Sequence, residues 1–261
     1  MKKALPCLLL LISLSLLLFG CGTDGTITYA YPVAGEYTAG DGEAEDVTEL
    51  LIDWVYGAVT VKVSDVPSVR YSESGKDLPD DLQMRTMVRD GVLVIAFAKP
   101  GVHVTSKKYD KSLTVLVPKS FSASEIDLRV VSADLRMEGL NAENASIKTV
   151  SGEVTATDLN CDALDIDTVS GDVDLNGTVS LLTLGSVSGD VRLTGPLPDK
   201  VTAETVSGNF TVKTTAETGF SVTFETVSGR FHNGYGDGTT FGDGNKTVAF
   251  KSVSGDLNIE K

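Results

Sequence analysis

The stretch Leu164-Asp165-Ile166-Asp167-Thr168-Val169-Ser170-Gly171-Asp172-Val173-Asp174-Leu175 decides the fold of this chain. Apolar and polar residues alternate on both sides of the phrase Val-Ser-Gly-Asp, which begins at Val169. Alternation with a period of two is typical of strands with one buried face, so the phrase marks a corner between two short strands. Glycine suits this corner because it tolerates positive φ angles and close backbone approach.

The same phrase recurs down the chain at a nearly constant interval. Its copies, including a degenerate first one, begin at Val131, Val150, Val169, Val187, Val206, Val227 and Val253. The successive intervals are 19, 19, 18, 19, 21 and 26 residues. A fixed period of about 20 marks a repeat architecture in which each unit buries its apolar face only by stacking on its neighbours. We therefore predict an all-β, single-stranded β-solenoid (a β-helix) with two short strands in each coil of about 19 residues. A Thr or Ser before the regular corners, such as Thr168, predicts a ladder of stacked hydroxyls.

The region before the regular repeats is less regular. The stretch 50–61 aligns with the repeat when Gly57 is placed at the corner, which predicts a first, divergent coil. Residues 64–111 break the period, and Asp90-Gly91 suits a type I′ hairpin turn, so we expect an antiparallel excursion here.

The globular part therefore divides into an N-terminal β segment, 47–120, and the repeat solenoid, 121–261. The last copy of the repeat runs into the short polar stretch 258–261. We expect this stretch to end the stack and blunt its exposed strand edge.

The first 20 residues have the features of a bacterial signal peptide. A basic start precedes an apolar run from Leu8 to Phe19, which is too short for a comfortable membrane span of about 20 residues. Leu18-Phe19-Gly20-Cys21 resembles the lipobox of bacterial lipoproteins, and this resemblance implies diacylglycerol on the Cys21 sulfur and cleavage before that residue. The alternative is a plain secretory signal followed by a chance cysteine.

The lipoprotein interpretation predicts the cellular location of the protein. Residues 21–46 are rich in Gly, Thr, Ala and acidic residues and predict a flexible tether. Several acyl chains give stable anchoring where one does not. We therefore expect an extracytoplasmic protein, lipid-anchored through Cys21 to the bacterial cell membrane or outer membrane.

Charge and cysteine content exclude several classes of protein. The net charge of −14 becomes more negative by two when the leader is removed with Lys2 and Lys3, so we expect no nucleic-acid partner. Cys161 is then the one cysteine left besides Cys21, and it has no disulfide partner. We interpret Cys161 as a small packing residue.

The fourth residue of each corner forms a mostly acidic column. Its members are Asp134, Glu153, Asp172, Asp190, Asn209, Arg230 and Asp256. Each carboxylate is expected to accept a hydrogen bond from the backbone of its own corner. The alternative is a row of divalent cations, since Ca²⁺ favours clustered carboxylate oxygens. Asp172 and Asp190 are the candidates for Ca²⁺ in this column, and Asp237 and Asp243 are a second pair of candidates in a glycine-rich insert. No other cofactor is expected.

Two threonine columns form the flattest candidate binding face. They consist of Thr155 and Thr211 in one column and Thr183, Thr202 and Thr223 in the other. Threonine is also an ordinary residue of exposed strand surfaces, so this pattern alone does not identify a ligand.

The sequence predicts no catalytic residues. His103 and His232 have no spacing that suggests a metal site or a nucleophile–base pair. Polysaccharide-cleaving β-helix enzymes need carboxylates beside Arg or Lys on adjacent coils of one face. On the outward position two residues beyond the acidic column, Arg136 and Arg192 lie three coils apart, on the order of 14 Å at the strand spacing.

The corner repeats, the stretch Val55-Tyr56-Gly57-Ala58-Val59 and the segment 113–118 together resemble the bacterial "putative adhesin" family of β-strand-repeat domains. The resemblance covers roughly Val47 to the C-terminus, and it implies a right-handed, β-helix-like solenoid at the cell envelope without established catalytic residues.

The favoured function is therefore a non-catalytic binding and display module for a protein, a glycan or the cell-wall matrix. One alternative is an envelope-stress or signalling accessory with a membrane-protein partner. The less favoured alternative is a carbohydrate-active β-helix enzyme.

Overall fold

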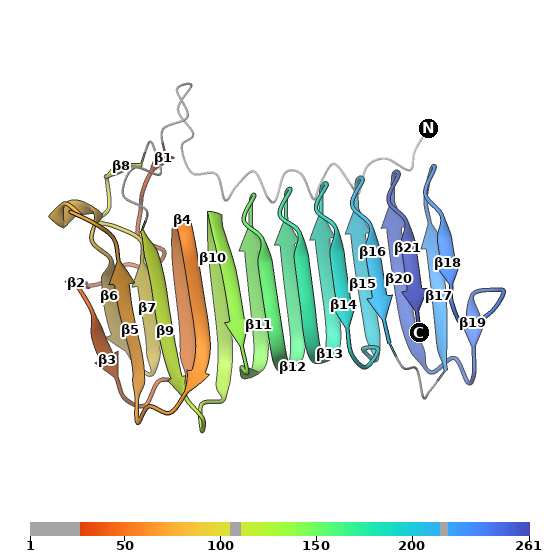
Figure 1. The fold of residues 1–261 in the computed structure, drawn as a ribbon, viewed down its shortest axis with the longest axis horizontal. Coiled ribbons are helices and arrows are strands. Elements are labelled where there is room, and N and C mark those ends of the chain that lie inside the picture. The colour runs from red at the N-terminus through yellow and green to blue at the C-terminus, as the bar shows by residue number, and fades with distance from the viewer. Residues whose placement is uncertain (1–26, 105–110, 215–218) are drawn as a thin grey trace.

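The structure of the chain is a computed structural model that describes residues 27–104, 111–214 and 219–261. It is an elongated stack of coils in which the strands lie side by side along the length of the molecule (Figure 1). The predicted all-β solenoid is confirmed. The one helical element in these three ranges is the short 3-10 helix η1 (Asp80–Leu82).

Each regular coil has one strand segment before its corner and one after it. Neighbouring coils pair in parallel at equal positions, so that Ile147 lies beside Ile166, and Ile166 beside Leu184. These side chains are buried, which follows from the alternation in the sequence. The strands of the stack are β4 (Glu49–Ser64), β7 (Val92–Ala96), β9 (Ser112–Pro118), β10 (Ala123–Glu138), β11 (Asn141–Thr149), β12 (Val154–Thr168), β13 (Val173–Ser186), β14 (Val191–Thr194), β15 (Lys200–Thr205), β16 (Phe210–Lys213), β17 (Phe220–Glu225), β18 (Phe231–Asn233), β20 (Lys246–Ser252) and β21 (Leu257–Glu260).

The corners are held by their own side chains and by contact between coils. The buried Thr168 hydroxyl donates to the Gly171 carbonyl at 2.8 Å. A Cβ atom on Gly171 would lie 2.1 Å from the carbonyl oxygen of Gly152 in the preceding coil. The corner glycines do not have the positive φ that the sequence analysis suggested, since Gly57 is the only corner glycine among those with positive φ. Glycine is therefore needed here because the backbone of the preceding coil leaves no space for a side chain.

The order of the coils in space differs from their order in the sequence at the C-terminal end. β20 pairs with β15 on one side and β17 on the other, and β21 lies between β16 and β18 in the same way. The prediction that the polar end of the chain forms the exposed edge is therefore wrong. The glycine-rich insert contains β19 (Thr240–Phe241) and follows β18. Its length lets the chain turn back, so that β20 and β21 form a coil between the coil of β15 and β16 and the coil of β17 and β18.

The N-terminal end shows a comparable arrangement. β4 matches the predicted first coil, with Gly57 in register with Ala133, but it is not the outermost coil. β7 and β9 pair with β4 in parallel on its outer side. The antiparallel excursion is therefore smaller than expected, because β7 returns to the stack immediately after the turn at Asp90-Gly91.

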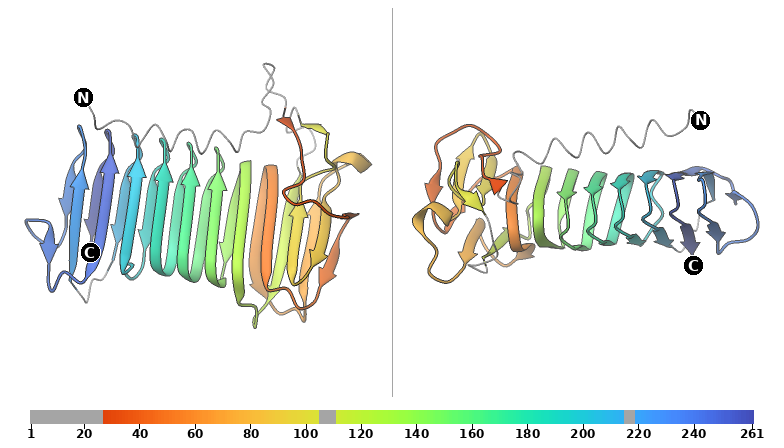
Figure 2. Two further views of the ribbon diagram at one scale, coloured as in Figure 1. Left: turned by 180° about the vertical axis from the view of Figure 1, so that it is seen from behind. Right: turned by 90° about the horizontal axis from the view of Figure 1, so that it is seen from above.

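Short strands close the N-terminal end, and we call this region the cap (Figure 2). Its elements are β1 (Ile27–Thr28), β2 (Thr38–Ala39), β3 (Gly42–Ala44), β5 (Val69–Ser74), η1, β6 (Arg85–Arg89) and β8 (His103–Val104). β5 and β6 pair in antiparallel fashion with β9 and β7.

The stretch 21–46, for which we predicted a flexible tether, belongs partly to the cap. From Ile27 onward it contributes β1, β2 and β3. Tyr29 is 4% exposed and its ring packs against Phe97. The apolar and aromatic residues among the acids explain this packing, since a tether has no such contacts to make.

The structure agrees with the expected packing role of Cys161. Its side chain is buried in the stack, and burial raises the pKa of its thiol to about 11.

Within the described ranges, no helix is long and apolar enough to cross a membrane.

Candidate functional site

The acidic column stands on the face formed by the strand segments after the corners, which we call the post-corner face. Its carboxylates bond to the backbone of the adjacent coil, and not to their own corner as expected. Asp172 Oδ1 accepts from the N–H of Asp190 at 2.9 Å, and Asp190 Oδ1 accepts from the N–H of Asn209 at 2.8 Å. These bonds continue through Asn209 to Asp256 and from Asp256 to Arg230. The column is therefore a hydrogen-bonded ladder that ties consecutive coils together.

The second candidate pair for Ca²⁺ lies in the glycine-rich insert. Asp243 Oδ1 accepts from the backbone N–H groups of Gly219 and Asn245, at 2.9 and 3.2 Å. Asp237 is exposed in the same insert. Over the described residues, no three His, Cys, Asp or Glu side chains gather in a way that could hold a metal ion.

The threonine columns are less continuous than the sequence suggested. Thr183 and Thr202 are neighbours on the face formed by the segments before the corners, which we call the pre-corner face. The inserted C-terminal coil places Ala249 between Thr202 and Thr223. On the post-corner face, Asp174 and Arg192 separate Thr155 from Thr211.

A cluster of charges on the pre-corner face was not identified from the sequence. Asp53, Arg129, Lys148 and Asp167 follow one another on adjacent coils of that face. Arg129 donates from Nε to Asp127 Oδ1 at 3.2 Å and also forms an ion pair with that carboxylate. The sequence could have predicted part of this cluster. Aligning the apolar pair Leu50 and Ile52 with Ile126 and Leu128 places Asp53 beside Arg129.

Partial burial of this cluster shifts its ionisation. Desolvation raises the pKa of Asp53 to about 6, while the Tyr29 hydroxyl and Arg129 act in the opposite direction. Desolvation, and then the nearby Asp165, raise the pKa of Asp167. Carboxylates beside Arg and Lys on adjacent coils are the arrangement that a β-helix enzyme would need. Here, however, Asp127 engages the Arg129 guanidinium, so the cluster contains an internal ion pair.

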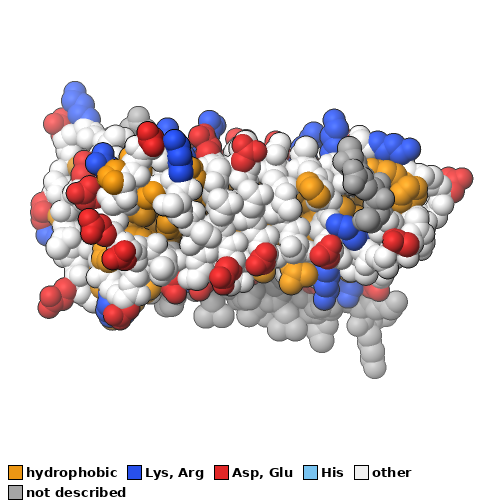
Figure 3. Space-filling view, turned by 90° about the horizontal axis from the view of Figure 1, so that it is seen from below, with side chains coloured by type: hydrophobic (Ala, Val, Ile, Leu, Met, Phe, Trp, Pro, Cys, Tyr) orange, Lys and Arg blue, Asp and Glu red, His pale blue; other side chains and the backbone are white. Residues whose placement is uncertain are grey.

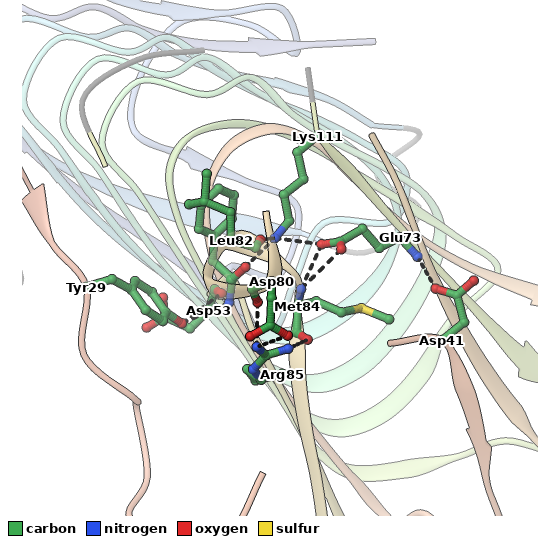
Figure 4. Close-up of polar contacts among 10 residues, drawn as sticks. Tyr29, Asp41, Asp53, Glu73, Asp80, Leu82, Met84, Arg85 and Lys111 are labelled. Carbon is green, nitrogen blue, oxygen red and sulfur yellow. Dashed lines mark hydrogen bonds and ion pairs between the residues drawn. The ribbon is translucent and has the colours of Figure 1, made fainter. Parts of the chain in front are cut away.

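The interior of the cap contains a buried ion pair that the sequence analysis also missed. Lys111 is fully buried, and its Nζ lies 2.6 Å from Glu73 Oε1. The same Nζ donates to the carbonyl groups of Leu82 and Phe97 (Figure 4). It also lies 4.7 Å from the ring centroid of Trp54 and 4.1 Å from that of Phe97.

Further polar contacts extend this pair toward the surface of the cap. Glu73 accepts from the backbone N–H of Met84 at 3.0 Å. Arg85 donates to the Asp80 carbonyl at 2.5 Å and to its carboxylate at 3.3 Å (Figure 4). Desolvation lowers the pKa of Lys111 to about 8, against the opposing effect of Glu73. Because Lys111 has no exposed surface, this group holds the cap onto the stack and is not a reactive site.

Cys21 and the signal peptide lie outside the described residues. His103 lies in the cap and His232 on the post-corner face of the last coil in space. The two histidines therefore belong to opposite ends of the molecule (Figure 1).

Comparisons with known proteins agree with this architecture. The family model described as Toastrack DUF4097 matches residues 58–260. A solved structure of a putative adhesin from Bacteroides fragilis is similar with a TM-score of 0.54 and 18% identity, over 86% of this chain and 98% of that one. A putative lipid binding protein from Parabacteroides distasonis has a TM-score of 0.46 and 17% identity, over 87% of this chain and 98% of that one. No curated protein matches the sequence.

At a sequence identity of 18%, the similarity to the Bacteroides fragilis structure shows the fold alone. The family match begins in β4 and ends in β21, so it includes all the corners from Val131 to Val253. The predicted resemblance to adhesin-like β-strand-repeat domains is confirmed, and the chain belongs to the Toastrack DUF4097 family.

Proposed function

We propose that this chain is an extracytoplasmic, non-catalytic binding and display module of the bacterial cell envelope. The observation that carries this proposal is the pair of outward faces, on which exposed and half-buried polar residues lie in register over consecutive coils. Thr183 and Thr202 are one such pair, and Asp174 and Arg192 are another. A stack of this kind offers an extended, repetitive surface to an extended ligand.

Two further features support a binding role. Two sets of polar groups are engaged in bonds that hold the fold together: the acidic column bonds to neighbouring coils, and Lys111 is buried against Glu73. The similar protein from Bacteroides fragilis is described as a putative adhesin, although that description belongs to that protein. We propose a glycan or a protein of the envelope as the ligand.

The proposed anchor is a lipid on Cys21. It would hold the module at the bacterial cell membrane or at the outer membrane. Mass spectrometry of the protein purified from membranes tests this point, since a diacylglyceryl group adds a mass that Cys21→Ser removes.

The proposed function is tested with residues 21–261 carrying Cys21→Ser, applied to a glycan array and crosslinked on whole cells. A saturable glycan signal is the expected result. The matched variants are Thr183→Lys/Thr202→Lys on the pre-corner face and Thr155→Lys/Thr211→Lys on the post-corner face. Loss of binding in one pair only would identify the face. A single crosslinked membrane protein without any glycan signal would instead favour the signalling alternative, and product release from a polysaccharide would contradict the non-catalytic proposal.

A further inference from the structure

A cavity of about 510 Å³ lies in the cap, where β3, the segment after it and the start of β5 face the turn between β9 and β10. This volume is within the range of small-molecule sites in proteins. Its apolar lining comes from Val47, Pro67, Val69, Pro118 and Phe121. Because Phe121 and Val69 are buried, they form a fixed wall and not a flexible surface.

Acidic side chains surround this apolar wall. Glu43, Glu45 and Asp46 line the cavity together with a single cation, Arg70. Figure 3 shows acidic side chains beside an apolar patch at the cap end of the molecule.

The cation of the cavity is compensated by one of these acids. Arg70 Nε lies 3.5 Å from Glu43 Oε2, and Ser68 also donates to that oxygen at 3.4 Å. Glu45 and Asp46 are exposed, and across the described ranges neither carboxylate has an ion-pair partner. The nearby Lys119 is paired with Asp65. Two carboxylate charges are therefore left to act on whatever enters the cavity.

We infer that this cavity binds an organic cation, that is, an ammonium or guanidinium group carried on an apolar body. The apolar wall favours the body of such a ligand because binding removes apolar surface from water. The two uncompensated carboxylates favour the cationic group, and they repel any anion. A free amine and a lysine or arginine side chain of another protein present the same chemistry.

This site is separate from the surfaces proposed for display. Its residues come from the cap, the entry to β4 and the turn between β9 and β10, whereas the threonine and acidic columns belong to the regular coils. If the cavity fails to bind a cation, the proposed display role is unaffected. If the display faces fail to bind a glycan or a protein, the inference about the cavity is unaffected.

Calorimetric titration of residues 21–261 carrying Cys21→Ser tests the inference with three probes of equal length, pentylamine, pentanol and pentanoate. Pentylamine is expected to bind about tenfold more tightly than pentanol, and pentanoate to give no signal. The advantage of the amine should decrease with added salt, since the rim carboxylates are exposed. Nα-acetyl-lysine amide is the fourth probe, and tighter binding than pentylamine would identify a protein side chain as the source of the cation.

The matched variants locate the site. Glu45→Gln/Asp46→Asn removes both charges, and Asn is suited to position 46 because Asp46 has a φ of 53°. This variant should lose about tenfold in affinity for pentylamine and nothing for pentanol. The control Glu143→Gln/Asp162→Asn removes two exposed charges elsewhere and should bind as the parent does. Circular dichroism checks that both variants fold. Equal binding of pentylamine and pentanol, absence of amine binding at millimolar concentration, or an equal loss in the control would each overturn the inference.

Discussion

At the scale of single residues, each corner depends on the absence of one side chain and the presence of another. Gly171 is needed because the Gly152 carbonyl occupies the place of a Cβ atom, and Thr168 closes the turn with its hydroxyl. The repeat predicted which residues occupy the corner. It offered both positive φ and close backbone approach as reasons for glycine and could not decide between them, because the contact forms between residues of different coils.

Gly171→Ala should lower the free energy of unfolding by about 2 kcal/mol or more, since the added methyl group must displace backbone of the preceding coil. Denaturant unfolding followed by circular dichroism measures this loss. Asn176→Ala, at an exposed strand position of the same coil, is the control. A loss at Gly171 no larger than that of the control would contradict the close-contact explanation.

The buried Lys111 was beyond sequence reasoning because its partners come from three separate segments. Glu73, Leu82 and Phe97 lie in or beside the irregular excursion, which has no repeat to align. In sequence, Lys111 follows the polar stretch 105–110, which itself contains two lysines and an aspartate, and such residues are usually solvated.

Lys111→Met should destabilise the chain by about 3 kcal/mol, because it leaves the carboxylate of Glu73 buried without a cation. Lys111→Met/Glu73→Gln should recover part of this loss, since the glutamine oxygen can still accept from the Met84 N–H. Thermal unfolding at pH 7 compares the two variants. If the double variant is no more stable than the single one, the charge of Glu73 is not the source of the loss.

The raised pKa of Asp53 predicts a pH dependence of stability. The folded chain holds a proton at Asp53 up to about pH 6, while the unfolded chain releases it near the ordinary value of 3.8. The folded state therefore binds this proton more tightly, and stability should fall as the pH rises from about 4 to 6. Asp53→Asn should lack this decline and be more stable than the parent at pH 7, with little difference at pH 4. Melting temperatures of both proteins across this range measure the effect, and parallel profiles would contradict it.

At the scale of the elements, the repeat predicted the strands well but not their order in space. The intervals of 19 residues suggested that each coil covers the one before it. At the C-terminal end β20 and β21 lie inside the stack, and at the N-terminal end β4 is covered by β7 and β9. The last interval of 26 residues was the only sign of this order, because a return past one coil needs a longer connection.

Removal of residues 246–261 should therefore affect more than the last coil of the sequence. β17 and β18 would lose the strands to which they pair in parallel, and the stacking of Phe224 on Phe250 would be lost with them. Limited proteolysis with mass spectrometry should show cleavage throughout 219–245 in the truncated chain and protection of β17 and β18 in the parent. Continued protection of these strands after truncation would contradict the observed order.

At the scale of the whole molecule, the sequence predicted an all-β stack with an acidic surface, and the structure and the family match confirm the stack. The candidate sites were predicted less well. Thr202 and Thr223 are separated by Ala249, and the carboxylates of Asp172 and Asp190 are bonded to backbone N–H groups. In both cases the error arose from treating columns as if the chain stacked in sequence order and as if each corner were independent.

The internal position of the last strand has a mechanical consequence. A pull on Lys261 acts on β21, which is joined to β16 on one side and to β18 on the other. The strand cannot be peeled from a free edge one coil at a time, because both of its ladders resist the load together. Under tension, as when a tethered surface protein is drawn by a bound particle, this end of the stack should yield in one large step.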